Sequence, residues 1–269
     1  MTKSTIAWVV ASIAFTAALI FSARWYTTGT SPIAPPPVAQ IPESAPQALS
    51  PPSPPKIEHP IERVQAEPGP STPATLDGSD LAMREALASL FEGKLPTFVQ
   101  PMNLIRNIVA TIDNLPRSKA APRLWPVQPT SGALATISAG DNLVIAADNS
   151  TRYAPAVALV HAIDSKQLVA IYVRFYPLFQ QAYRDLGYPD GYFNDRLVAV
   201  IDHLLATPSV RQPIAWVQPK VLYQYADPEL EALSAGQKAM LRIGPENAAV
   251  VKAKLREIRY RVAGPIVQR

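Results

Sequence analysis

The chain has 269 residues, 29 of them proline and none cysteine, and its formal charge is +4. The lack of cysteine excludes a disulfide-stapled fold, a cysteine zinc site, an iron–sulfur centre and a thiol nucleophile. Fourteen of the prolines lie between Thr27 and Gly78, and this stretch is predicted to form neither helix nor sheet. The length of the remaining chain predicts one globular domain.

The N-terminal region has the composition of a membrane anchor. No charged side chain occurs from Ile6 to Ala23, and Trp25 and Tyr26 follow as typical interfacial residues. A helix of about 18 residues is about 27 Å long, close to the hydrocarbon thickness of a bilayer. We therefore expect a transmembrane anchor at 6–23 after a cytoplasmic stub at 1–5, with the rest of the chain exported; the alternative is a cleaved secretory signal.

Residues 27–78 are predicted to be a disordered, proline-rich linker. They include Pro-Pro-Pro at 35–37 and Ser-Pro-Pro-Ser-Pro-Pro at 50–55, with few large apolar side chains. Such chain favours polyproline II, at about 3.1 Å per residue. We expect a semi-rigid spacer that holds the domain away from the bilayer.

Residues 79–262 have the composition of one globular domain, followed by a tail at 263–269. Apolar residues recur at helical spacing in several segments, namely 79–91, 101–115, 165–186, 197–205, 229–233, a segment after Ser234, and 245–262. The period changes to two at 133–138 and 143–147, around a turn at 140–142, and short extended pieces follow at 214–217 and 221–225. The expected class is mostly α with a small antiparallel β element (α+β).

The sequence holds few features of an active site. Its three histidines lack metal-ligand spacing, and it contains no phosphate loop, dinucleotide fingerprint or serine elbow. We therefore expect no cofactor and no metal site, and no nucleic-acid partner. Asp195 and Asp202, with His203 beside them, supply the alternative of an envelope hydrolase, although seven residues of helix place the two carboxylates about 10 Å apart.

Two groups of residues are candidates for a binding surface. Arg117, Lys119 and Arg123 lie near Trp125 in a proline-rich loop, where an arginine fork beside an aromatic face can recognise phosphate, carboxylate or a sugar ring. The alternative is a solvated loop whose arginines pair with acids of the domain and whose tryptophan packs in the core. The second group is expected on an exposed loop and consists of Tyr188, Asp190, Tyr192 and Asn194.

The last predicted helix is rich in basic residues. It carries Lys252, Lys254, Arg256, Arg259 and Arg261, opposed in that stretch by Glu257. Such a helix can attract anionic lipid head groups or an acidic polymer. A plain solvated face is the alternative.

Several long motifs together resemble a known family. They are Asp-Asn-Leu-Pro-Arg at 113–117, Ala-Pro-Arg-Leu-Trp-Pro at 121–126, Phe-Tyr-Pro-Leu-Phe-Gln-Gln-Ala-Tyr at 175–183, Gly-Tyr-Pro-Asp-Gly-Tyr-Phe-Asn-Asp-Arg-Leu at 187–197 and Leu-Ser-Ala-Gly-Gln-Lys at 233–238. The sequence resembles a proteobacterial family of single-pass membrane proteins that carry a domain of unknown function, number three thousand and fourteen, over nearly all of Leu81 to Arg261. The resemblance implies a location in the envelope of Gram-negative bacteria and brings no activity or catalytic residue.

These observations predict an inner-membrane-anchored periplasmic module. We expect a non-catalytic binding or scaffold function toward an envelope partner, either a protein or an anionic wall or lipid component. Two alternatives remain: a cell-wall hydrolase with an unfamiliar site, and a structural subunit of an inner-membrane complex.

Overall fold

The structure is a computed structural model that describes residues 56–64, 75–130, 135–139, 142–218 and 223–264. The predicted anchor at 6–23, most of the linker and most of the tail lie outside these ranges. Within the described ranges, no single helix is both long and apolar enough to cross a bilayer. Two consecutive helices, Ala154–Ala162 and Ser165–Asp185, reach that length and composition together but are bent by 79°.

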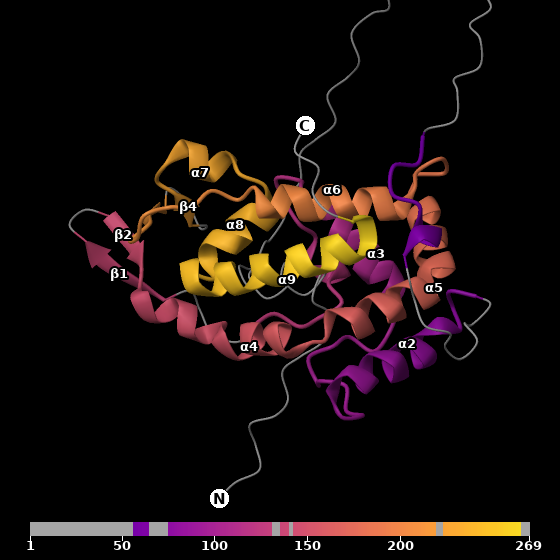
Figure 1. Ribbon diagram of the computed structural model, residues 1–269. Helices are drawn as coiled ribbons and strands as arrows, with labels where there is room; N and C mark the ends of the chain where they lie inside the picture. Colours follow the sequence, from indigo (N-terminus) through magenta and orange to yellow (C-terminus); the bar gives the residue numbers. More distant parts are fainter. Residues whose placement is uncertain (1–55, 65–74, 131–134, 140–141, 219–222, 265–269) are drawn as a thin grey trace, which may run out of the picture.

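The described residues form a helical bundle with a small sheet at one end (Figure 1). The helices are α2 Ser79–Ala88, α3 Leu104–Asn114, α4 Ala154–Ala162, α5 Ser165–Asp185, α6 Phe193–Leu205, α7 Pro228–Ala232, α8 Ala235–Arg242 and α9 Pro245–Ala263. The strands are β1 Thr136–Ala139, β2 Asn142–Ile145, β3 Ala215–Val217 and β4 Gln224–Tyr225. The described part is thus mostly helical with a small antiparallel sheet, as predicted.

Helix α9 lies at the centre of the bundle. Its apolar residues Val251, Leu255, Ile258 and Val262 recur at helical spacing and are buried, and α4, α5, α6 and α8 pack against α9. In Figure 1, α6 runs along one side of α9, and α4 and α5 lie along the other. An apolar stripe at helical spacing needs such neighbours, because a lone helix would leave it in water.

The helix ends largely follow the local sequence. Asp164 accepts bonds from the amides of residues 166 and 167 at the start of α5, and Ser234 and Gln237 form a capping box on α8. Helix α3 differs from the prediction because it begins at Leu104 rather than at Pro101. Asn103 has a φ of 54°, which breaks the helix, and the carboxylate of Asp80 in α2 accepts the amides of Asn103 and Leu104 instead.

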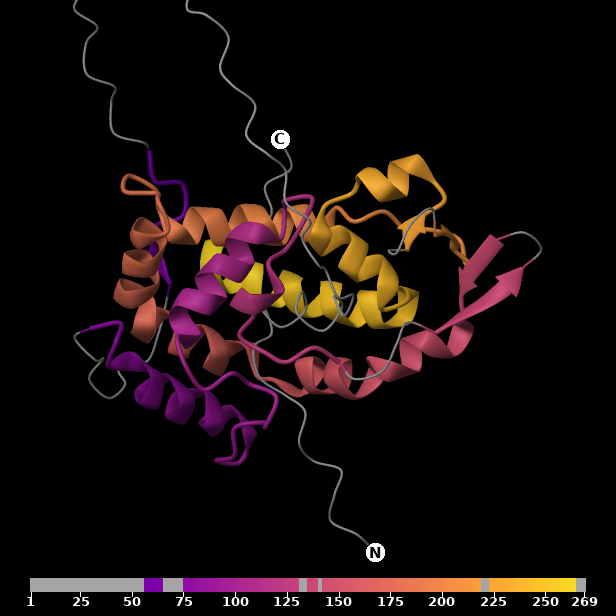
Figure 2. The same cartoon turned by 180° about the vertical axis from the view of Figure 1, so that it is seen from behind.

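The sheet has the strand order β1-β2-β3-β4, and all three pairs are antiparallel. The predicted hairpin is present as β1 and β2. Strand β2 also pairs with β3, where Leu143 lies opposite Trp216. Figure 2 shows the sheet at the end of the bundle away from α2. A second, smaller apolar core joins the sheet to the bundle and contains Ile145, Ile214, Trp216, Tyr225, Leu230 and Leu241.

The folded part begins before the predicted boundary at Ser79. Residues 56–64, here called the strap, lie on the start of α6, and the side chain of Ile61 is buried in the main core. Leu76 is buried there as well. The prediction of a disordered linker up to Gly78 is therefore wrong for these residues, because their few apolar side chains and their backbone amides find partners on the domain.

Candidate functional site

A buried carboxylate lies at the end of α3, where several of the sequence motifs meet. Asp113 is 1% exposed and accepts hydrogen bonds from Arg117 Nη2 at 2.6 Å, Arg196 Nε at 3.0 Å and the Tyr188 hydroxyl at 3.2 Å. Arg196 Nη2 also donates to the Asp113 carbonyl oxygen at 2.8 Å. We call these four residues the Asp113 cluster.

The Asp113 cluster carries more positive than negative charge, since two guanidinium groups face one carboxylate. The hydrogen bond and the charge of Asp113 raise the pKa of Arg117, which keeps this guanidinium charged. Both hydrogen bonds of Arg117, to Asp113 and to Tyr188, come from Nη2, and 54% of its side chain remains exposed. Arg117 is therefore fixed at one nitrogen while the rest of its fork faces solvent.

The N-terminus of α8 holds the turn that carries Arg117. The amide of Ala235 donates to the Arg117 carbonyl at 2.8 Å, and the amide of Gly236 donates to the Leu115 carbonyl at 2.9 Å. A Cβ atom on Gly236 would lie 2.6 Å from Leu204 Cδ2 and 3.1 Å from the Leu115 carbonyl oxygen. Only glycine allows this close approach, so the motifs at 113–117 and 233–238 are coupled by packing.

The end of the loop before α6 and the first turn of that helix face the domain rather than solvent. Asn194 is fully buried; its Nδ2 donates to the carbonyls of His59 and Val262, and its Oδ1 accepts from the Tyr172 hydroxyl. The Tyr192 hydroxyl accepts the amide of Ile61 at 2.8 Å. Asn194 thus joins the strap to the end of α9.

The structure separates the eight predicted binding residues into three groups. It brings Arg117 and Tyr188 together at Asp113. It leaves Lys119, Arg123 and Asp190 exposed. The exposed-surface prediction is wrong for the remaining three, because Trp125 is 2% exposed in the core, Asn194 is buried and Tyr192 is half-buried against the strap. The alternative interpretation of this loop therefore holds for two residues: Trp125 packs in the core, and Arg117 pairs with an acid of the domain.

The carboxylates considered for hydrolysis have structural partners. Asp195 accepts the amides of Glu58 and His59 from the strap. Asp202 forms a two-pronged ion pair with Arg259, at 2.6 and 3.0 Å. In the described part of the chain, no three His, Cys, Asp or Glu side chains gather as a metal site would require.

His203 contacts Ser234 instead of either carboxylate. Its Nε2 lies 2.8 Å from Ser234 Oγ, which also accepts the amide of Gln237. The neutral ring can accept the serine proton through Nε2, while its protonated form cannot. This pair caps α8, and Ser234 is buried.

Acid is expected to weaken the fold through His203. Burial, and secondarily the charge of Arg196, lowers the pKa of His203 below its ordinary value of 6.5. The unfolded chain then binds more protons than the folded chain as the pH falls below about 6.5, so stability falls with it. Urea unfolding at pH 7.5 and 5.5 measures how much free energy of unfolding is lost on acidification. This loss should be smaller for His203→Gln than for the wild type, and equal losses in the two proteins would contradict this assignment.

The basic residues of α9 are mostly used inside the domain. Lys254 is buried and bonds to the Ile163 carbonyl and to Glu257, and Arg259 is buried against Asp202. Lys252 donates to the Thr207 carbonyl at 2.6 Å. Of these five basic residues, Arg256 and Arg261 are exposed, which leaves little of the candidate lipid-binding face and of the alternative solvated basic face.

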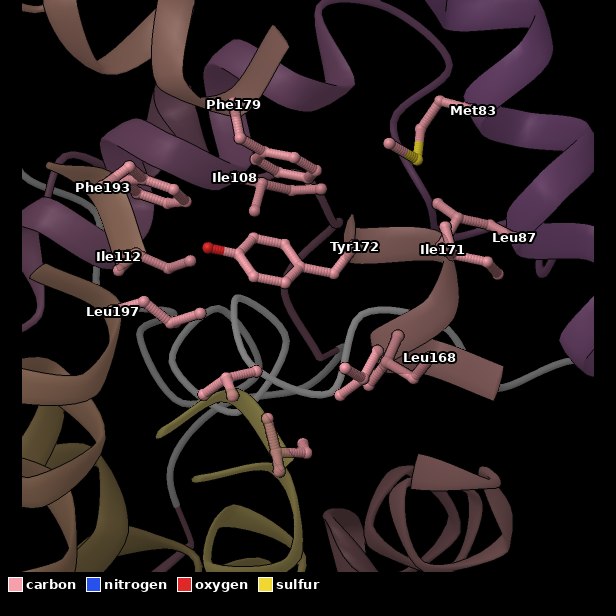
Figure 3. A pocket seen from close by; sticks show the side chains of 13 residues that line it. Met83, Leu87, Ile108, Ile112, Leu168, Ile171, Tyr172, Phe179, Phe193 and Leu197 are labelled. Carbon is pink, nitrogen blue, oxygen red and sulfur yellow. The ribbon is translucent and has the colours of Figure 1, made fainter. Parts of the chain in front are cut away.

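An apolar cleft that the sequence did not predict lies between α2, α3 and α5 (Figure 3). Its lining residues are Met83, Leu87, Ile108, Ile112, Leu168, Val169, Ile171, Tyr172, Phe179, Phe193, Leu197, Ile258 and Val262. The ring of Tyr172 lies in the middle of the cleft, and burial raises the pKa of its hydroxyl well above the ordinary value. The space measures about 60 Å³, less than half of the roughly 150 Å³ cavity that holds a benzene ring, so we assign it to core packing.

These residues define a class of small α+β domain, in which a helical bundle is organised around an internal ion-pair cluster and ends in a short sheet. A comparison with protein families matches residues 104–259 to the family described as "Protein of unknown function (DUF3014)", and the chain belongs to this family. The match confirms the predicted resemblance to the domain of unknown function number three thousand and fourteen, and it covers the structure from α3 into α9. No curated protein and no solved structure matches the chain.

Proposed function

We propose that this protein is a non-catalytic binding module of the bacterial envelope. In this proposal, residues 6–23 anchor it in the inner membrane and the domain lies in the periplasm, where it recognises a carboxylate or phosphate group of an envelope partner. The partner is a protein or an anionic wall or lipid component. The uncharged run at 6–23 supports the anchor.

The observation that carries this proposal is the geometry of Arg117. Its guanidinium is held through Nη2 and presents its other nitrogens to solvent. A guanidinium that is already fixed loses less entropy when it binds an anion, and its planar fork matches a carboxylate or phosphate. Lys119 and Arg123, on the same loop, are exposed and add positive charge.

Reversing the charges of Lys119 and Arg123, which are exposed, tests the proposal without disturbing Asp113. Full-length protein carrying Lys119→Glu and Arg123→Glu is compared with wild type by crosslinking and affinity capture from native membranes. In parallel, it is tested with wall fragments and with vesicles of phosphatidylglycerol or phosphatidylcholine. Capture of the anionic partner is expected to fall by about tenfold or more, as for the loss of charge-assisted hydrogen bonds.

Two further variants control this experiment. Arg117→Lys keeps the charge but removes the fork and should reduce binding with little change in thermal stability. Lys94→Glu reverses an exposed charge outside this loop and should leave binding unchanged. If the double variant captures the same partner as fully as wild type does, the anion-binding proposal fails, and a stoichiometric partner would then favour a structural subunit.

A further inference from the structure

A second concave surface lies at the turn between α8 and α9, on residues that the Asp113 cluster does not use. Two adjoining hollows, of about 520 and 150 Å³, share Gln212, Leu241, Gly244 and Pro245. The two adjoining hollows together are here called the α8–α9 groove. The larger part reaches the β1–β2 hairpin, and the smaller part follows the first turns of α9.

The α8–α9 groove has a buried apolar floor and an exposed rim. Val144, Ile145, Met240 and Leu241 belong to the floor and are buried. The rim residues Pro208, Ser209, Gln212, Pro213, Pro245, Glu246 and Ala249 are exposed. The total space lies within the roughly 300–1,000 Å³ of ligand sites in proteins, so the groove is open to solvent and large enough for a ligand.

A hydrophobic side chain stands at the hairpin end of the groove. Ile137 in β1 is 56% exposed and lies directly opposite Val144 in β2. The two therefore share one face of the sheet, with Val144 below and Ile137 at the edge. This end offers an apolar contact to a ligand that lies in the groove.

The opposite end of the groove carries a positive charge. Lys252 Nζ donates to the Thr207 carbonyl at 2.6 Å, which uses one of its three protons. In the described ranges no carboxylate pairs with Lys252, and its charged neighbour is Arg256, of the same sign. A bound anion would relieve this repulsion and accept a remaining ammonium proton.

The groove follows the first two turns of α9 and continues to the β1–β2 hairpin. Lys252 lies two helical turns, or about 10 Å, from Pro245 along α9, and the larger hollow continues from Pro245 to Ile137. An extended peptide of four to six residues spans about 13–20 Å. Gly244, at φ 89°, lies in the floor between the ends, and a Cβ there would approach Ser150 Cβ to 2.9 Å.

We propose that the α8–α9 groove binds an extended peptide segment through a carboxylate on Lys252 and an apolar side chain on Ile137 and Val144. The peptide carboxylate is a C-terminus or an acidic side chain. This site lies apart from Arg117 and adds a second binding activity to the one proposed above.

The test uses full-length protein in lipid nanodiscs and a library of synthetic hexapeptides with free C-termini. Peptides that bind are expected to bind about tenfold or more weakly to Lys252→Gln and within about threefold of wild type to Lys252→Arg, which keeps the charge. Amidation of the C-terminus, and separately Asp→Asn or Glu→Gln within the peptide, identifies which carboxylate is bound.

Two variants at other residues of the groove test the proposal without depending on whether a Lys252 variant folds. Ala249→Trp places a large side chain on the exposed rim and should abolish binding, and Ile137→Asp should weaken it. Lys94→Glu, which reverses an exposed charge outside both proposed sites, should leave hexapeptide binding unchanged. Failure of every hexapeptide to bind with a Kd below about 1 mM, or binding that is indifferent to Lys252→Gln and Ala249→Trp, would overturn the proposal.

Discussion

Replacing Asp113 with alanine is expected to lower the free energy of unfolding by about 2–4 kcal/mol. Breaking a fully buried ion pair costs about 3–5 kcal/mol, and this value is reduced here because 29% of the Arg196 side chain is exposed and solvent screens its charge. The variant removes the acceptor for Arg117, Arg196 and Tyr188 together. Urea unfolding monitored by circular dichroism measures the difference.

Asp77→Ala is the matched control for this experiment. Asp77 also pairs with an arginine, Arg106, at 2.8 Å, but its side chain is 86% exposed. An exposed pair of this kind contributes about 0–1 kcal/mol. If Asp113→Ala lowers the free energy of unfolding by no more than Asp77→Ala does, the buried carboxylate does not organise the domain.

Asn194→Ala is expected to destabilise the protein by about 2–4 kcal/mol and to loosen the strap. Each buried polar group left without its partner costs about 1–3 kcal/mol, and the variant removes the partner of the Val262 carbonyl and of the Tyr172 hydroxyl. The bond to the His59 carbonyl is lost as well. Hydrogen exchange should therefore become at least about tenfold faster at the amides of His59 and Ile61.

Asp190→Ala controls for the position of the substitution, because Asp190 lies in the loop just before α6 and is exposed. This variant should change the free energy of unfolding by less than about 0.5 kcal/mol. If Asn194→Ala leaves the exchange rates of the strap at their wild-type values, Asn194 does not hold the strap to the domain.

The parts of the fold that follow from local sequence were predictable. The stripe of α9, the Asp164 cap of α5, the Ser234 cap of α8 and the β1–β2 hairpin each depend on residues within a few positions of one another. Local spacing and capping chemistry carry this information. The pairing of β2 with β3 joins Leu143 to Trp216, and no local pattern encodes a contact across that separation.

The candidate site was predictable only in part. The sequence singled out Arg117 and Tyr188 but not Asp113, because one acidic residue near the end of a helix has no distinctive pattern. The spacing of four residues between Asp113 and Arg117 would have suggested their ion pair. Arg196, more than 80 positions from Asp113, completes the cluster through tertiary packing alone.

The strap determines where a pulling force would enter the domain. In the tethered arrangement that we propose, tension from the membrane travels along the chain and meets residues 58–61 before it meets α2. Four hydrogen bonds to Tyr192, Asn194 and Asp195 share that load, together with the buried side chain of Ile61. The force is therefore delivered to the start of α6, close to the end of α9, and not to the chain that enters α2 while the strap remains bound.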